Sequence, residues 1–130
     1  TQANLIVISS ILKPYESVIS ANTGHIAVHE AGSIEATGHK INTIKTKEGK
    51  LTPQDIKSVI DFHQDEHMVK PRLVFISNST EIGSIYKKKE LEELSSFCKK
   101  NGLFLYLDGA RLGSALTSYS NNFFIFSPSS

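Results

Sequence analysis

The sequence has only one cysteine, Cys98, and none of its apolar runs approaches the length of a membrane span. A lone cysteine cannot form a disulfide within the chain and is typical of a reducing compartment, so we expect a cytoplasmic protein. Cys98 shares helical spacing with Leu91, Leu94 and Phe97, which indicates a core position rather than a nucleophile. A membrane-spanning helix needs about 20 consecutive apolar residues, so we expect no membrane partner.

An excess of charge of one sign is also missing. The chain has 14 Lys and Arg residues against 13 Asp and Glu residues, which gives a formal net charge of +1. A nucleic-acid-binding domain normally presents a basic face or stripe, and the densest basic run here, residues 87–89, lies where a surface helix is expected to begin. The Gly-x-Gly-x-x-Gly and P-loop patterns do not occur either. We therefore expect no nucleic-acid partner, and a simple nucleotide-binding domain is disfavoured.

Short apolar runs alternate with helix-like segments along the whole chain. The expected strands are residues 17–20, 41–46, 73–76 and 103–107, and residues 123–126 are also strand-like. The expected helices are residues 3–12 and 25–31, a segment from 53, residues 87–100 and a segment from 110. This order predicts an α/β protein with three α/β/α layers around a mostly parallel sheet.

The run at residues 103–107 ends on a carboxylate, Asp108, which is followed at once by Gly109. Five apolar residues in a row indicate a strand that is buried on both faces. In open α/β sheets, ligands bind outside the carboxyl ends of the strands, so Asp108 is a candidate site residue. The alternative is that Asp108 only caps the next helix, and this stretch alone leaves both interpretations open.

Three strand ends should lie along one edge of such a sheet. They carry residues 20–25, 77–80 and 108–111, which include hydroxyl, amide, carboxylate and guanidinium groups. Thr1, at the start of the first expected helix, would offer a hydroxyl and a backbone N–H group to an anion. The sequence therefore predicts one convergent pocket built from separate segments.

Four of the five histidines form two pairs with helical spacing, His25 with His29 and His63 with His67. Such a pair can bind zinc, but a zinc site needs three or four ligands, so we predict no metal site. We interpret His29, His39 and His63 as exposed polar residues. His25 follows an expected strand-to-helix turn and is the better functional candidate.

Four segments in order along the chain resemble the threonine aldolase/β-eliminating lyase family: residues 1–5, 24–32, 49–53 and 108–112. Each motif alone is weak, but four in register are specific. The resemblance implies a pyridoxal-phosphate (PLP) enzyme with the type I, aspartate-aminotransferase fold. It further implies that residues 1–130 are an incomplete PLP-binding large domain, without the family's small C-terminal domain.

The resemblance also implies roles for individual residues. Thr1 matches the threonine that holds the PLP phosphate, and His25 matches the histidine that stacks on the pyridine ring near the substrate. His67 matches a second histidine near the substrate side chain. Asp108 matches the aspartate that pairs with the pyridine nitrogen. Arg111 matches the arginine that reaches the substrate carboxylate or the cofactor's O3′ oxygen.

These implied roles agree with the chemistry of the group. PLP accepts electrons when its ring nitrogen is protonated, and a carboxylate beside that nitrogen favours the protonated form. Cleavage of L-threonine or a related β-hydroxy-α-amino acid to glycine and an aldehyde needs a base at the hydroxyl group. Either His25 or His67 can fill that role. The resemblance also implies that the full-length protein is a homodimer or homotetramer.

The sequence departs from the family at two places. Residues 77–81 stand where many members have Glu-Asn-Thr, and only Asn78 is retained, which puts the substrate in doubt. The lysine that attaches PLP in the family lies beyond Ser130, and no lysine follows Asp108. We therefore expect this chain to be inactive alone. The alternatives are β-elimination on another amino acid and a non-catalytic remnant or assembly module.

Overall fold

The computed structural model describes residues 2–28, 32, 34–78, 80, 82–109 and 123–126. The elements, in chain order, are α1 (Gln2–Ile11), β1 (Glu16–Ala21), α2 (His25–Val28), the 3₁₀ turn η1 (Glu35–Thr37), β2 (Ile41–Ile44), α3 (Pro53–Phe62), β3 (Lys70–Ser77), α4 (Lys88–Lys100), β4 (Phe104–Asp108) and β5 (Phe123–Phe126). The expected helix from residue 110 lies outside the described residues. None of the described helices is long and apolar enough to cross a membrane.

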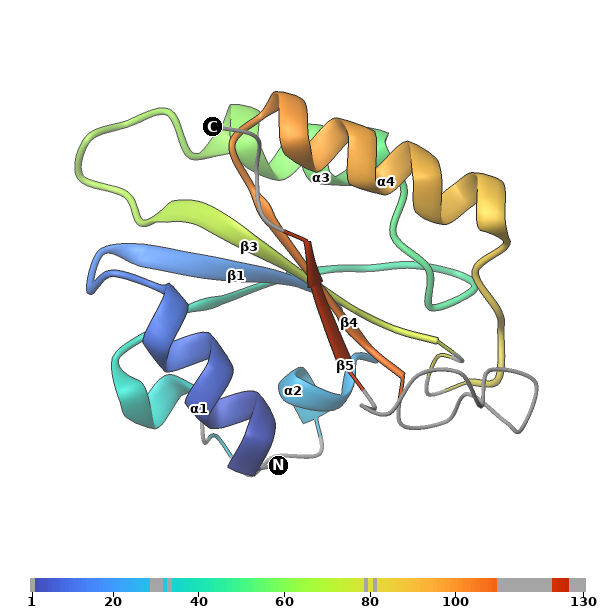
Figure 1. Ribbon diagram of the computed structural model, residues 1–130. Helices are drawn as coiled ribbons and strands as arrows, with labels where there is room; N and C mark the ends of the chain where they lie inside the picture. The colour runs from blue at the N-terminus through green and yellow to red at the C-terminus, as the bar shows by residue number, and fades with distance from the viewer. Residues whose placement is uncertain are drawn as a thin grey trace.

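The strands form one sheet in the order β2-β1-β3-β4-β5. The first four are parallel, and β5 pairs antiparallel with β4 at the edge. Figure 1 shows α1 and α2 against one face of the sheet and α3 and α4 against the other. This arrangement confirms the predicted α/β class with three layers.

Each face of the sheet has its own hydrophobic cluster, because neighbouring strand residues point to opposite faces. The cluster under α1 and α2 contains Ile8, Leu12, Val18, Ile26, Ile34, Leu73, Phe75 and Tyr106. The cluster under α3 and α4 includes Cys98, which is 1% exposed. Burial raises the pKa of the Cys98 thiol to about 12. The predicted core role of Cys98 is therefore confirmed.

The boundaries of α3 and α4 follow from residues at their ends. Thr52 Oγ1 accepts a hydrogen bond from Asp55 N at 3.3 Å, and Asp55 Oδ2 accepts one from Thr52 N at 2.9 Å. Pro53 occupies the first turn of α3, where its missing N–H group has no intrahelical partner to lose. Gly102, just after α4, has a φ of +67°, which glycine adopts most readily.

The interpretation of the histidines as exposed surface residues is wrong for His39. This side chain is 6% exposed, and its Nδ1 atom lies 3.2 Å from the carbonyl oxygen of Glu16. A histidine ring tolerates such burial when a ring nitrogen bonds to a main-chain group. His63 is half-buried, with Nδ1 2.7 Å from the carbonyl oxygen of Val59. His29 lies outside the described residues.

Candidate functional site

The candidate site lies at the carboxyl edge of the sheet, where β1, β3 and β4 end. The register pairs Ser77 of β3 with Asp108 of β4, so the last residues of these strands are neighbours. Asp108 is half-buried. Because strand residues alternate in direction, Asp108 faces the same side as Tyr106, which packs in the cluster under α1 and α2.

The start of α1 lies on this same side of the sheet. Tyr106 Oη donates a hydrogen bond to Asn4 Oδ1 at 2.6 Å, and both residues are buried. Asn4 belongs to the first turn of α1. The N-terminal turn of α1, which carries a partial positive charge, is thus tied to β4 two residues before the Asp108 carboxylate.

A tight turn connects β1 to α2 at the same edge. Gly24 N donates to the carbonyl oxygen of Ala21 at 2.8 Å. A Cβ atom at Gly24 would lie 2.2 Å from Ser20 Oγ and 3.0 Å from that carbonyl oxygen, so only glycine fits. His25 follows as the first residue of α2, and this placement brings its main chain to the carboxyl edge. Its side chain lies outside the described part of the structure.

A small hollow joins the ends of β1 and β3. Its volume is about 10 Å³, and its lining includes Ser20, Thr23, Gly24, Ser77 and Thr80. This space is about the size of one water molecule. The structure therefore brings together two of the three segments that the sequence placed in one pocket. The third, residues 108–111, is described only as far as Gly109, which is buried.

Asn78 links the end of β3 to two other segments. It is 7% exposed, and its main-chain N–H donates to the carbonyl oxygen of Asp108 at 3.1 Å. Its side-chain Oδ1 accepts a hydrogen bond from the main-chain N–H of Tyr86, also at 3.1 Å. Asn78 therefore joins Tyr86, which lies beyond the segment 77–81, to the end of β4.

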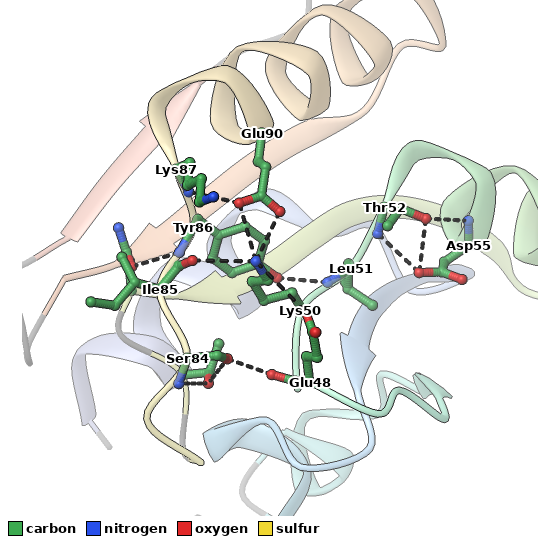
Figure 2. A network of polar contacts seen from close by, with 12 residues as sticks. Glu48, Lys50, Leu51, Thr52, Asp55, Ser84, Ile85, Tyr86, Lys87 and Glu90 are labelled. Carbon is green, nitrogen blue, oxygen red and sulfur yellow. Dashed lines mark hydrogen bonds and ion pairs between the residues drawn. The ribbon is translucent and has the colours of Figure 1, made fainter.

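Tyr86 continues this network toward the connection between β2 and α3 (Figure 2). Its ring is 3% exposed, and its Oη atom accepts a hydrogen bond from Leu51 N at 2.7 Å. Burial raises the pKa of the Tyr86 phenol well above its usual range. The phenol is therefore neutral at physiological pH and acts here as a hydrogen-bonding anchor.

An ion pair lies beside this anchor, nearer to solvent (Figure 2). Lys50 Nζ donates to the two carboxylate oxygens of Glu90 at 3.1 and 2.9 Å and to the carbonyl oxygen of Ile85 at 3.3 Å. Hydrogen bonds from Lys87 N–H and from Lys50 lower the pKa of Glu90. The pair connects the residues before α3 to the start of α4.

The structure separates His67 from the other predicted site residues. His67 lies in the loop between α3 and β3, and its side chain is 86% exposed. Because β3 begins at Lys70 and ends at Ser77 beside Asp108, His67 lies at the amino edge, opposite the candidate site. The role near the substrate side chain that the resemblance implies for His67 is therefore not supported by its position in this chain. Thr1 and Arg111 lie outside the described residues.

Sequence reasoning missed the network around Tyr86. Lys50 was part of a recognised motif, residues 49–53, but nothing in that motif pointed to Glu90 or Tyr86. The only available signal was the spacing of Lys87 and Glu90, which is typical of a helix start with an acidic third residue. Tyr86 is a single aromatic residue before this helix start, so it is part of no hydrophobic repeat from which its burial could be predicted.

Comparison with known proteins decides the family. The sequence model of the β-eliminating lyase family matches residues 1–123. The chain belongs to this family. Within it, the low specificity L-threonine aldolase of Pseudomonas sp. (strain NCIMB 10558) is 43% identical over 117 residues. The enzyme of the same description from Saccharomyces cerevisiae is 29% identical over 119 residues.

Solved structures of the family agree with this assignment. The threonine aldolase of Leishmania major superposes with a TM-score of 0.86 at 54% sequence identity and covers 89% of this chain. A putative L-allo-threonine aldolase from Listeria monocytogenes superposes with a TM-score of 0.59 at 29% identity and covers 85% of it. The chain spans about a third of these family members: 34% of the Pseudomonas enzyme and 34% of the Leishmania chain.

Proposed function

We propose that this chain is the cofactor-binding part of a PLP-dependent carbon–carbon lyase that cleaves L-threonine or a related β-hydroxy-α-amino acid. The observation that carries the proposal is the position of Asp108, a half-buried carboxylate at the end of β4 on the face that α1 covers. The similarity to L-threonine aldolases over 88% of the chain supports the substrate class.

The described residues fit PLP in charge and position. The group has a basic ring nitrogen at one end and a phosphate at the other. The Asp108 carboxylate suits a protonated ring nitrogen, and the first turn of α1, tied to β4 through Asn4 and Tyr106, suits an anion. Thr1 would then hold the phosphate, and Arg111 the substrate carboxylate or the O3′ oxygen.

PLP, when bound, supplies the electron sink of the reaction. Asp108 keeps the proton on the ring nitrogen by charge pairing. His25 takes the proton from the substrate's β-hydroxyl group, and its position at the carboxyl edge supports this role over His67, which lies at the opposite edge. A base must lie within hydrogen-bond reach of the proton that it removes.

Two measurements test the proposal. PLP is titrated into the isolated chain and followed by absorbance and by sodium borohydride reduction. We expect non-covalent binding, no specific covalent attachment and no turnover, because no lysine follows Asp108. Cofactor fixed to one specific lysine would contradict the non-covalent mode, and absence of any binding would contradict the cofactor assignment.

The reaction is tested in a chimera, with residues 1–122 of this chain joined to the remaining part of the Pseudomonas aldolase. The chimera is assayed with threonine, serine, cysteine and an aromatic amino acid. Acetaldehyde and glycine from threonine support the aldolase. Pyruvate from serine or cysteine, without acetaldehyde from threonine, supports the alternative of a β-eliminating lyase, which the replaced segment 77–81 favours.

We further propose that the complete protein is a cytoplasmic homodimer or homotetramer. The lone cysteine, which is buried, supports a reducing compartment. Exposed apolar side chains support association, among them Ile6 (56%), Val28 (54%) and Ile85 (63%). Sedimentation of the chimera tests the oligomeric state, and a monomer at micromolar concentration would contradict it.

A further inference from the structure

We propose that Asn78 and Tyr86 are positioning residues that hold the Asp108 end of β4 in register with the connection between β2 and α3. The inference rests on the proposed function, because it concerns the carboxylate that is to pair with the PLP ring nitrogen. It goes further by giving a role to Asn78, the retained residue of the segment 77–81 in which the chain departs from the family pattern, and to Tyr86, which follows that segment.

The first step is the contact between Asn78 and the Asp108 main chain. The bond from Asn78 N–H to the Asp108 carbonyl oxygen, at 3.1 Å, comes directly after the last paired residues, Ser77 and Asp108. It therefore continues the ladder between β3 and β4 by one more bond. Since strand β4 ends at Asp108, this bond fixes the point from which the carboxylate projects.

Further hydrogen bonds connect the described residues between Asn78 and Tyr86. Asn78 Oδ1 accepts a hydrogen bond from Tyr86 N–H. Inside the segment, Thr80 N donates to the Ser84 carbonyl oxygen at 2.9 Å, and Gly83 N donates to the Thr80 carbonyl oxygen at 3.0 Å. The Thr80 and Ser84 hydroxyl oxygens lie 2.5 Å apart. These bonds tie the described residues Asn78, Thr80, Gly83, Ser84 and Tyr86 to one another.

These residues are also joined to the residues before α3. Leu51 N–H donates to the Tyr86 phenol, and Ser84 Oγ donates to the carbonyl oxygen of Glu48. The two segments also touch at Gly49, where a Cβ atom would lie 3.1 Å from Ile82 Cγ1. Gly49 has a φ of +74°, so its turn is restricted both by conformation and by space.

The buried residues of this network couple the connection before α3 to the main chain at Asp108. Asn78, Tyr86 and Leu51 are 7%, 3% and 3% exposed. A buried N–H group that loses its acceptor is destabilised by more than an exposed one, because water does not replace the bond. A change at Tyr86 is therefore transmitted to Asn78 and, through the Asn78 N–H group, to the Asp108 main chain. The network thereby acts on the carboxylate without contacting the cofactor.

The experiment compares two ligands, PLP and the analogue in which carbon replaces the ring nitrogen. Tyr86→Phe removes only the phenol oxygen, and Asn78→Ala removes the side-chain carboxamide and with it the acceptor of the Tyr86 N–H group. We expect each variant of the isolated chain to bind PLP about three- to tenfold more weakly, the loss of one buried hydrogen bond. The analogue offers no partner to Asp108, so its dissociation constant should change less than twofold.

Arg72→Met is the matched control. Arg72 contacts Glu16, Gly102 and Phe104 at the amino edge, so this variant lowers stability without touching the network. It should leave the affinity for both ligands unchanged. Equal weakening of both ligands in the Tyr86 and Asn78 variants would overturn the proposal, because it would show a general loss of structure. Unchanged PLP binding would overturn it as well.

Amide hydrogen exchange gives a readout without any ligand. Tyr86→Phe should speed exchange at the Leu51 and Asn78 amides, and Asn78→Asp, which keeps an acceptor, should restore the protection of the Tyr86 amide that Asn78→Ala removes. Faster exchange at Leu51 with an unchanged Asn78 amide would overturn the coupling. If the wild-type chain binds neither ligand, the cofactor proposal fails, while these exchange rates still decide whether the coupling exists.

Discussion

The two edges of the sheet use polar side chains in different ways. At the amino edge, the Glu16 carboxylate accepts a hydrogen bond from Lys13 N at 2.8 Å and lies 3.9 Å from Arg72 Nε. Arg72 stacks over Phe104, with 5.0 Å from its guanidinium carbon to the ring centre, and donates to the carbonyl oxygen of Gly102. Each of these side-chain groups is used within the fold. The contacts join the starts of β1, β3 and β4.

At the carboxyl edge, a network of buried side chains holds the main chain at the residue that carries the candidate carboxylate. Asn78, Tyr86 and Leu51 bond to one another and to the Asp108 main chain, while the Asp108 side chain projects toward the face under α1. The Glu16 and Arg72 contacts at the amino edge stabilise the fold, whereas the network at the carboxyl edge fixes the main chain at Asp108, the residue that we propose to pair with the cofactor. Variants at the two edges should therefore separate affinity from stability.

The largest effect is expected at Asp108. In the chimera, Asp108→Asn should lower kcat by about 100-fold or more, because a neutral amide no longer holds the ring proton by charge. In the isolated chain it should remove the preference for PLP over the carbon analogue. Urea unfolding should show a change of less than about 1 kcal/mol. A preference for PLP that survives Asp108→Asn would break the proposed pairing.

The opposite pattern is expected at the amino edge. Arg72→Met should lower the free energy of unfolding of the chain by about 2 kcal/mol, because it leaves the buried Glu16 carboxylate without its cationic neighbour. The affinity for PLP should not change. Glu16→Gln with Arg72→Met, in one chain, should recover part of the loss, since the uncompensated charge is then absent. Loss of PLP affinity in the single variant would contradict the separation of the two edges.

The sequence was sufficient to predict the three layers, the mostly parallel sheet and the positions of its strands along the chain. Apolar runs separated by capped helices predicted β1, β3 and β4, and the Thr52-Pro53 pair located the start of α3. The sequence also placed Asp108 at a strand end, since a carboxylate directly after five apolar residues has few other positions in a parallel sheet.

The contacts between segments were out of reach of the sequence. The bond between Tyr86 and Leu51 joins residues 35 positions apart, and no local period encodes such a pair. His39 was misjudged for the same reason, because its burial depends on a carbonyl oxygen of β1. The assignment of His67 to the substrate side chain came from the resemblance alone, although His67 precedes β3 whereas Asp108 ends β4.

A smaller effect is expected at the cap of α3, which lies next to Leu51. Thr52→Ala should lower the free energy of unfolding by about 1 kcal/mol, the usual loss for a helix N-cap. PLP affinity should fall less than twofold, because the bond from Leu51 N–H to Tyr86 is retained. Thermal or urea unfolding and PLP titration of the same sample check both parts. A PLP defect as large as that of Tyr86→Phe would show that the helix start, rather than the phenol bond, sets the site.

The smallest effect is expected at Glu90, and it depends on pH. Folding lowers the pKa of Glu90 from its ordinary value of 4.5 through hydrogen bonds from Lys87 N–H and Lys50. A lowered carboxyl pKa contributes stability above the unfolded value and loses it as the pH falls through the folded value. Glu90→Gln should therefore be less stable than wild type at pH 7 by under about 1 kcal/mol, since the pair is partly exposed to solvent.

The difference from wild type should shrink as the pH falls through the lowered folded pKa of Glu90, where its carboxylate becomes protonated. The PLP affinity of the variant should change less than that of Tyr86→Phe. The physical reason is burial: the side chain of Glu90 is 35% exposed, so water replaces its bonds, whereas no water replaces the acceptor of the buried Leu51 N–H group. A stability difference that persists unchanged at pH 3 would show that Glu90 contributes through packing rather than through its charge. A loss of PLP affinity equal to that of Tyr86→Phe would show that the ion pair between Lys50 and Glu90 also helps to position Asp108.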